Sequence, residues 1–299
     1  ASGLDVQSQG LVINISLLEG SASSTTFWQS KNELKFGHNL GAEFLLSHSG
    51  SKGNLEYMIS GERNADNRVT ERVERAFDPN ERQTGIKNVD ALRKTRGFKI
   101  NSNLSYNFED GGVLRLNGLY EPEEEFGDEF RIERGDDPED ILWQKDEDKV
   151  KWEFGGDYTR NLGELGKLKL LFVVNRENKE EIVDRFTGAG TAEFQNVKDD
   201  ENEVKKEKIF RASLTKNITE KQIIEFGGEA AINTFDKTFS KLERDFMIDP
   251  FVLDSSDNVE IKENRYEIFA NHSYNISNNM VLQSSLTTEF SKIVADNIF

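Results

Sequence analysis

The sequence predicts an all-β fold, a partial antiparallel up-and-down transmembrane β-barrel of about 11 strands. Two observations support this prediction. Many segments alternate apolar and polar residues, and short turns recur at nearly even spacing near Ser51, Glu109, Leu162, Ile218 and Ser277. Long acidic stretches separate these hairpins. Short turns at one end and long loops at the other are typical of outer-membrane barrels, whose periplasmic turns are short and whose extracellular loops are long.

The alternation is clearest in the segment from residue 98 to 108. Phe98, Ile100, Leu104, Tyr106 and Phe108 fall on one side of an extended chain, and Lys99, Asn101, Asn103, Ser105 and Asn107 fall on the other. Successive side chains of a strand point to opposite faces, so each such segment has one apolar face and one polar face. The same reasoning predicts strands near 25–36, 42–49, 54–62, 95–108, 112–120, 149–160, 167–177, 206–216, 221–236, 264–275 and 279–292.

The alternation alone fits two architectures. A soluble sandwich packs its apolar faces together, whereas a membrane barrel turns them toward lipid around a polar interior. Tyr106, Tyr158 and Tyr274 favour the barrel, because each lies on an apolar face shortly before a short turn, where an interfacial aromatic girdle is expected. The barrel predicts that the charged side chains of the opposite faces line a lumen, and the candidates are Lys99, Arg115, Lys151, Glu153, Lys169, Arg211, Glu225 and Glu229.

The composition excludes several classes of protein. Only 35% of the 299 residues are hydrophobic and no apolar run of about 20 residues exists, which excludes a helical membrane protein. The absence of cysteine excludes disulfides and thiolate metal sites. A net charge of −17 argues against nucleic acid as a partner, because phosphates require clustered Lys and Arg.

The negative charge is concentrated between the predicted strands. Residues 121–147 contain 13 acidic and 3 basic residues, and residues 179–208 are also rich in Glu and Asp. Such runs usually form solvated loop surface, and on an outer surface they would attract cationic solutes. Phe126, Phe130 and Trp143 lie in one of these predicted loops. Loop packing is the common reason for such aromatics, and contact with a sugar or a chelate is the functional alternative.

The first residues differ from the later hairpins. Residues 3–17 contain Gly10 followed by Val12, Ile13, Asn14 and Ile15, a glycine turn that leads into an apolar strand with an Asn-Ile pair. This segment resembles the end of the plug domain in TonB-dependent outer-membrane receptors. The likeness divides the chain into residues 1–23, the end of a plug, and residues 24–299, the first half of a barrel. An odd strand count also predicts a barrel that continues beyond this chain, since bacterial barrels have an even number.

The resemblance implies an active transporter. Such receptors take up a scarce large nutrient, such as an iron chelate, a cobalamin or a glycan, through a barrel of about 22 strands. It also implies as partners the outer-membrane lipid and the TonB complex, which would act through an N-terminal part that this sequence lacks. Nothing in the sequence identifies the substrate, and no cofactor is expected.

The sequence motifs give little support to an enzymatic function. His38, His48 and His272 have no metal-ligand spacing, and no GxSxG motif is present. Asp254, Asp257 and Glu260 resemble a calcium loop only loosely, and Gly188-Ala189-Gly190 is interpreted as a flexible turn. The alternatives to a receptor are therefore a porin without a plug, a structural barrel, or a soluble or secreted adhesin-like β-sandwich. A sandwich predicts that Trp152, Phe154, Phe172 and Phe226 are buried.

Overall fold

The computed structural model describes residues 23–35, 38–135, 138–188, 194–277 and 279–297. These residues form eleven strands and one 3₁₀ turn, Gly163–Leu165. The strands are β1 (Ser24–Lys35), β2 (His38–Lys52), β3 (Leu55–Phe77), β4 (Gln83–Asn107), β5 (Val113–Gly135), β6 (Asp140–Asn161), β7 (Lys167–Gly188), β8 (Phe194–Thr219), β9 (Gln222–Glu243), β10 (Val252–Ser277) and β11 (Met280–Asn297).

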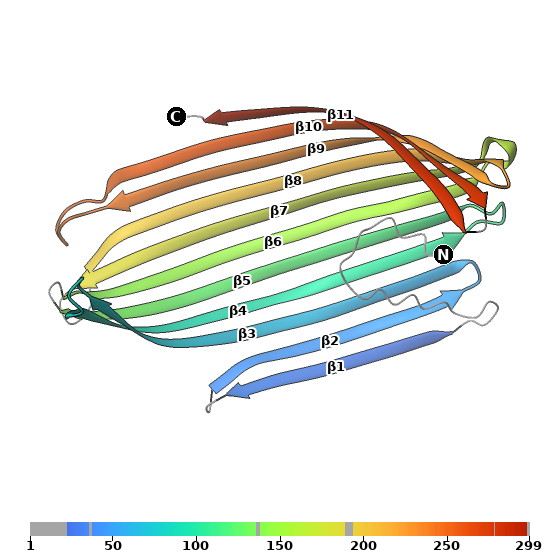
Figure 1. Ribbon diagram of the computed structural model, residues 1–299. Coiled ribbons are helices and arrows are strands. Elements are labelled where there is room, and N and C mark those ends of the chain that lie inside the picture. The colour runs from blue at the N-terminus through green and yellow to red at the C-terminus, as the bar shows by residue number, and fades with distance from the viewer. Residues whose placement is uncertain (1–22, 36–37, 136–137, 189–193, 278, 298–299) are drawn as a thin grey trace.

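All eleven strands belong to a single antiparallel sheet, ordered in space as they are in the sequence. Figure 1 shows this meander as a curved sheet, with strands side by side from β1 to β11. The predicted all-β, antiparallel up-and-down architecture is therefore confirmed, as are the short turns between β2 and β3, β4 and β5, β6 and β7, β8 and β9, and β10 and β11. Among the described residues no helix is long and apolar enough to cross a membrane.

The acidic segments differ from the prediction, because most of their residues continue the strands rather than form loops. β5 and β6 extend through residues 121–135 and 140–148, and β7 and β8 extend through 178–188 and 194–205. The antiparallel pairing is maintained to these ends, with Phe126 opposite Asp146 and Ile182 opposite Asp200. The hydrophobic alternation stops in these segments, but the backbone hydrogen bonds and the pairing of charged side chains do not depend on it.

The register gives the sheet two chemically different faces. Cross-strand partners share a face, so the pairs Leu104–Leu116, Gly118–Phe154 and Phe154–Val174 place the apolar residues of β4 to β7 on one side. We call this side the apolar face and the opposite side, which carries Lys99, the charged face. The apolar face has no covering layer among the described residues: its side chains include Phe98 at 45% exposure, Phe154 at 47% and Phe226 at 51%.

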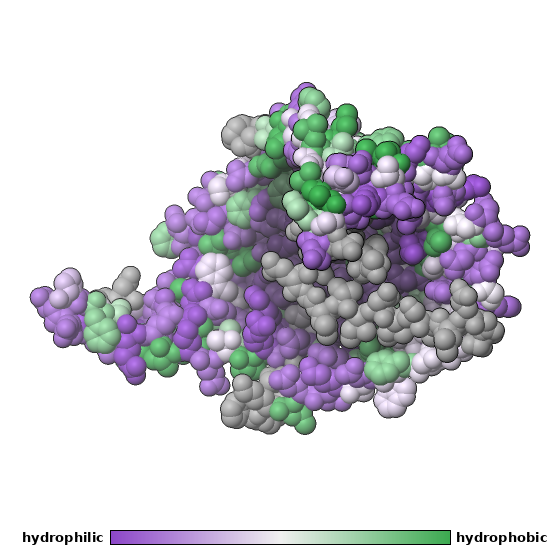
Figure 2. Space-filling model, turned by 45° about the vertical axis from the view of Figure 1, so that its right-hand side comes forward, coloured by the Kyte–Doolittle hydropathy of each residue, from purple (hydrophilic) through white to green (hydrophobic). Residues whose placement is uncertain are grey.

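Burial identifies the charged face as the concave one. The buried hydrophobic residues Val89, Ile141, Val197, Ala231 and Phe269 all lie on the charged face, according to the register of their strands. A curved sheet crowds the side chains on its concave side and spreads those on its convex side. Figure 2 shows a hollow on one side of the molecule, surrounded mainly by hydrophilic residues. The charged side chains therefore face the hollow and the apolar face looks outward.

The apolar face carries a band of limited height. On β4 it runs from Phe98 to the turn residue Phe108, about 33 Å along a strand at 3.3 Å per residue. At the tilt of about 40° that is usual for barrels, this length corresponds to about 25 Å across a bilayer, which matches the apolar band of membrane barrels. Beyond the band the strands continue with mostly polar residues, and apolar residues such as Leu92, Phe126 and Phe130 no longer occupy every second position.

Aromatic side chains mark both edges of this band. At the short-turn edge the ring of Phe108 lies 4.8 Å from that of Tyr106 and 6.1 Å from that of Tyr158. At the opposite edge Phe98 and Tyr120 lie 5.9 Å apart, and Tyr120 is paired with Trp152 in the register. Two aromatic rows are the arrangement that interfacial girdles require. The predicted plug remnant, residues 1–23, lies outside the described residues except for Ser23.

Candidate functional site

The charged face is the candidate site, because it combines ionisable side chains from many strands in one hollow. The register places seven of the eight predicted lumen residues on it as follows: Lys99, Arg115, Lys151, Glu153, Arg211, Glu225 and Glu229. Lys169 lies on the same face, opposite Ser213. The predicted residues therefore share one face of the sheet. That this face lines a lumen stays a prediction.

Two of these residues contact each other. Arg211 on β8 lies 3.7 Å from the carboxylate of Glu229 on β9, which is also 3.0 Å from Arg265 on β10. The guanidinium of Arg211 stacks 4.5 Å from the ring centre of Phe269. Glu225 accepts a hydrogen bond of 3.3 Å from the Asn271 amide. These contacts connect side chains of β8, β9 and β10 into one polar cluster at the level of the apolar band.

The other predicted residues occupy β4 to β6 and remain apart from that group. Arg115 forms an ion pair of 3.0 Å with Asp157. Lys99 lies 3.6 Å from Glu121, whose Cα is paired with that of Lys151. Glu153 accepts a hydrogen bond of 3.4 Å from the Asn117 amide. The charged face therefore carries local cross-strand pairs at this level rather than one convergent centre.

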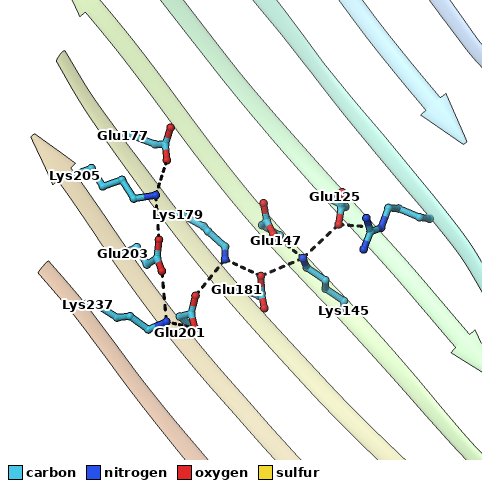
Figure 3. A network of polar contacts seen from close by, with 11 residues as sticks. Glu125, Lys145, Glu147, Glu177, Lys179, Glu181, Glu201, Glu203, Lys205 and Lys237 are labelled. Atoms are coloured by element: carbon cyan, nitrogen blue, oxygen red, sulfur yellow. Dashed lines mark hydrogen bonds and ion pairs between the residues drawn. The ribbon is translucent and has the colours of Figure 1, made fainter. Parts of the chain in front are cut away.

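A larger network lies farther from the short turns, where the sequence predicted loops (Figure 3). The Lys179 ammonium on β7 lies 2.9 Å from Glu181 and 3.2 Å from Glu201 on β8. Lys145 on β6 lies 3.1 Å from Glu181 and 3.3 Å from Glu125 on β5. Each of these cations bridges carboxylates from two strands, so the contacts connect the strands laterally.

The network continues in both directions. Lys237 on β9 lies 2.7 Å from Glu201, and Lys205 lies 3.2 Å from Glu177 and 3.3 Å from Glu203. At the other end the Arg93 guanidinium on β4 lies 3.2 Å from Glu125. We call the whole set the ion-pair ladder, which consists of Arg93, Glu125, Lys145, Glu147, Glu177, Lys179, Glu181, Glu201, Glu203, Lys205 and Lys237.

Proton affinities in the ladder are set by burial and by the paired charges. Partial burial by itself would raise the pKa of Glu181, but hydrogen bonds from Lys179 and Lys145 outweigh it and lower the pKa to about 2. Glu201 behaves alike: burial acts to raise its pKa, and hydrogen bonds from Lys237 and Lys179 lower it overall. Glu181 and Glu201 therefore stay ionised at neutral pH.

Sequence reasoning missed the ladder because it interpreted these segments as loops. A signal was present: charged residues recur at every second position in Lys145-x-Glu147-x-Lys149 and in Glu177-x-Lys179-x-Glu181. A period of two is the period of a strand whether the repeated residue is apolar or charged. The network offers exchangeable ion-pair partners to a charged or strongly polar solute, so its chemistry suits binding and passage.

The three aromatic residues proposed as ligand contacts do not form one site. Phe126 and Phe130 lie on β5 on the same side as the apolar band, beyond its edge, and Phe126 is 43% exposed. Trp143 lies on β6 on the charged face, since Arg185 and Glu129 are its cross-strand partners. The prediction that they sit in a loop is wrong, because the antiparallel pairing of β5 and β6 continues to Ile132 and Asp140.

Trp143 has a distinct environment among them. The guanidinium groups of Arg131 and Arg185 each lie 5.6 Å from its ring centre, a distance typical of cation–π contact. Arg131 is held by Glu129 at 2.5 Å and Arg185 by Glu139 at 3.3 Å. The indole Nε1 is buried without a hydrogen-bond partner among the described protein atoms. Trp143 thus packs between two arginines in the wall of the hollow.

The weak calcium-loop resemblance is not supported. Asp254, Asp257 and Glu260 lie within β10, where alternate residues point to opposite faces. Asp254 forms an ion pair with Lys241 at 3.3 Å and Glu260 with Lys262 at 2.5 Å. An extended strand cannot wrap these carboxylates around one ion, so the apparent ligand spacing belongs to ordinary surface pairs.

Comparison with known proteins gives only a weak structural likeness. No protein-family model matches the sequence, and no curated protein matches it. Among solved structures, the chain is similar to the ferric yersiniabactin uptake receptor FyuA from Yersinia pestis, with 10% sequence identity and a TM-score of 0.43. The match covers 91% of this chain and 50% of the receptor chain, so this chain spans about half the length of that protein.

Proposed function

We propose that this chain is part of an outer-membrane active-transport receptor of the TonB-dependent class, which takes up a scarce large nutrient. The observation that carries the proposal is the apolar band of about 25 Å, bordered by two aromatic rows, on the convex face of an up-and-down sheet. The concave face opposite the band is charged. A sheet with this division fits a barrel that faces lipid outside and water inside.

The soluble sandwich is disfavoured by the same faces. A sandwich would cover Trp152, Phe154 and Phe226 with a second sheet, whereas all described strands form one sheet and these side chains are 37%, 47% and 51% exposed. The receptor proposal assigns the eleven strands to the first half of a barrel of about 22 strands, a size that encloses a plug. The substrate class stays open between an iron chelate, a cobalamin and a glycan.

A porin without a plug is the second candidate. It is favoured by the dense ion pairing of the charged face, such as Arg115–Asp157 and Arg211–Glu229, which would line a permanently solvated passage. The two candidates differ in energy coupling. A porin lets solutes pass down their gradient, whereas a TonB-dependent receptor needs the proton gradient of the inner membrane.

Uptake measurements in the source cell separate the candidates. Labelled ferric chelate, cobalamin and oligosaccharide would be supplied to wild-type cells, to cells lacking the gene, and to cells whose proton gradient has been dissipated. The receptor proposal predicts accumulation of one of these solutes that disappears both with the gene and with the gradient. Gene-dependent entry that persists without the gradient would identify a porin, and an immunoblot that finds the protein outside the outer membrane would contradict both.

A further inference from the structure

A group of basic residues lies at the edge of the apolar band that is farther from the short turns. It lies just beyond the aromatic row of Phe98, Tyr120 and Trp152. On four strands, a basic residue follows the last apolar-face residue of the band, two positions farther from the short turns. These are Arg63 after Gly61 on β3, Arg96 after Phe98 on β4, Arg176 after Val174 on β7, and Lys208 after Phe210 on β8. Lys94 and Lys206 follow at the next alternate positions of β4 and β8. We call these six residues the basic margin: Arg63, Lys94, Arg96, Arg176, Lys206 and Lys208.

The basic margin lies directly against the aromatic row. Arg63 is the cross-strand partner of Phe98, and Arg176 is the cross-strand partner of Trp152. On β5 and β6 the first charges of the same face are acidic: Glu124, which is the cross-strand partner of Arg96, and Asp148. On β3, β4, β7 and β8, by contrast, the first charge next to the band is positive, although the whole chain carries a net charge of −17.

Among the described residues, five of these six cations lack carboxylate partners, unlike the lysines of the ion-pair ladder. On the charged face Lys145, Lys179 and Lys237 each contact at least two carboxylates. In the basic margin, by contrast, no ion pair within the described part of the chain involves these members: Arg63, Lys94, Arg96, Arg176 and Lys208. Only Lys206 has one, to Asp236 at 3.6 Å.

The strand register also places like charges together. Arg176 and Lys206 are direct cross-strand partners, and Lys208 is the next residue of that face on β8. Like charges directly opposite each other destabilise a sheet. The Arg176 Nε donates a hydrogen bond of 2.8 Å to the amide oxygen of Asn178, which is neutral and does not offset this repulsion. A third group with negative charge that binds between them would turn this repulsion into attraction. Guanidinium and ammonium groups that converge in this way suit a phosphate.

We propose that the basic margin binds the phosphate groups of anionic lipids in the leaflet that surrounds the long ends of the strands. The inference rests on the proposed membrane location and adds a lipid site to it. The lipid tails would pack on Phe98, Trp152 and Phe210, which are exposed just inside the band, while the phosphates would lie against Arg63, Arg96, Arg176 and Lys208. A membrane protein with a repelling net charge would thereby gain a local electrostatic attachment.

The test compares lipid affinity in two variants of the full chain refolded in dodecyl maltoside. R176N/K206Q/K208Q removes three charges from the margin, and R72N/R75N/K198Q removes three charges from strand ends far from the band. Phosphatidic acid and phosphatidylcholine would be titrated as mixed micelles, with intrinsic fluorescence as the readout. Because one cation near an anionic lipid surface is worth about a fivefold change in affinity, we expect a loss of at least tenfold for phosphatidic acid in the margin variant.

The control variant is expected to bind phosphatidic acid as the wild type does, and phosphatidylcholine is expected to bind all three proteins alike. Equal affinity for the two lipids in the wild type, or equal losses in both variants, would overturn the lipid site. Competition by millimolar inorganic phosphate would also overturn it, since a free-phosphate site would then explain the cluster. Flotation with liposomes separates this failure from that of the proposed function: a chain that does not float with any vesicle is not a membrane barrel at all.

Discussion

At the residue scale, the ion-pair ladder explains how strands rich in Glu and Asp can remain paired far beyond the apolar band. Lys145 and Lys179 each neutralise carboxylates from two strands, so the acidic residues act as acceptors in a lateral network rather than as a repelling surface. Exposed ion pairs contribute little singly, about 0.2–1 kcal/mol, but a connected series with partly buried members contributes more. The local stability of the hairpin ends beyond the band should therefore depend on individual cations of the ladder.

Replacing the central cation tests this dependence. Lys179→Gln leaves Glu181 and Glu201 without their shared partner, and we expect about 1 kcal/mol of lost local stability, or about fivefold faster amide exchange in residues 178–188 and 194–205. Hydrogen exchange followed by mass spectrometry measures it. Lys198→Gln removes a charge from β8 that has no ion pair among the described residues and serves as the control. Equal exchange in both variants would show that the ladder is not what keeps these strands paired.

The ladder also predicts how stability changes with pH. The pKa of Glu181 is lowered from its ordinary 4.5 to about 2, so its stabilising effect is fully present above pH 4.5 and is lost as the pH falls toward 2. The lowered pKa of Glu201 acts in the same direction. Trp143 reports on this region, so W28F/W152F gives a protein with one tryptophan as a probe. Its urea midpoint should be constant from pH 7 to 5 and fall below 4.5, and a midpoint that is unchanged at pH 3 would contradict the assignment.

At the element scale, each strand consists of a segment within the band and a segment beyond it. β4 has apolar residues at alternate positions only from Phe98 to the turn, while its first half carries Lys94 and Arg96 on the same face. Twenty-five residues span about 80 Å when extended, far more than a bilayer requires. In the proposed membrane barrel, the far halves of β3 to β10 would project into solvent and extend the wall of the hollow.

A matched pair of substitutions tests which face of β4 meets lipid. Leu104 and Asn103 are neighbours near the middle of the band but point to opposite faces. We expect Leu104→Arg to cost about 2–4 kcal/mol in a bilayer, because it places a charge in hydrocarbon, whereas Asn103→Arg should change the stability little. Urea unfolding of both variants in phosphatidylcholine vesicles provides the comparison. A larger loss for Asn103→Arg would reverse the assignment of the two faces.

The strand count and the faces could be predicted from the sequence, but the strand ends could not. Between Phe98 and Phe108 the local alternation is sufficient, because a strand with one apolar and one polar face has a period of two in its own residues. Between residues 121 and 148 no such signal remains, and pairing depends on which Glu meets which Lys on the next strand. Contacts such as Glu125 with Lys145 and Lys179 with Glu201 bridge about twenty positions, so their identity follows only from the register.

At the scale of the whole molecule, the account requires that the convex face meets lipid and the concave face meets water. Three features point to this division: the band of about 25 Å, the two aromatic rows, and the crowding of side chains on the charged side. The likeness to FyuA is too weak to add weight to it. The transport proposal and the lipid site both depend on the division, so it is the claim to test first.

Tryptophan quenching tests it most directly. Trp152 lies on the apolar face at the edge of the band, and Trp143 lies on the charged face between two arginines. W28F/W143F retains only Trp152, and W28F/W152F retains only Trp143. In vesicles of brominated phosphatidylcholine we expect strong quenching of Trp152 and little quenching of Trp143. Equal quenching of the two, or a Trp152 that remains unquenched in a chain that floats with the vesicles, would contradict the assignment of the apolar face to lipid.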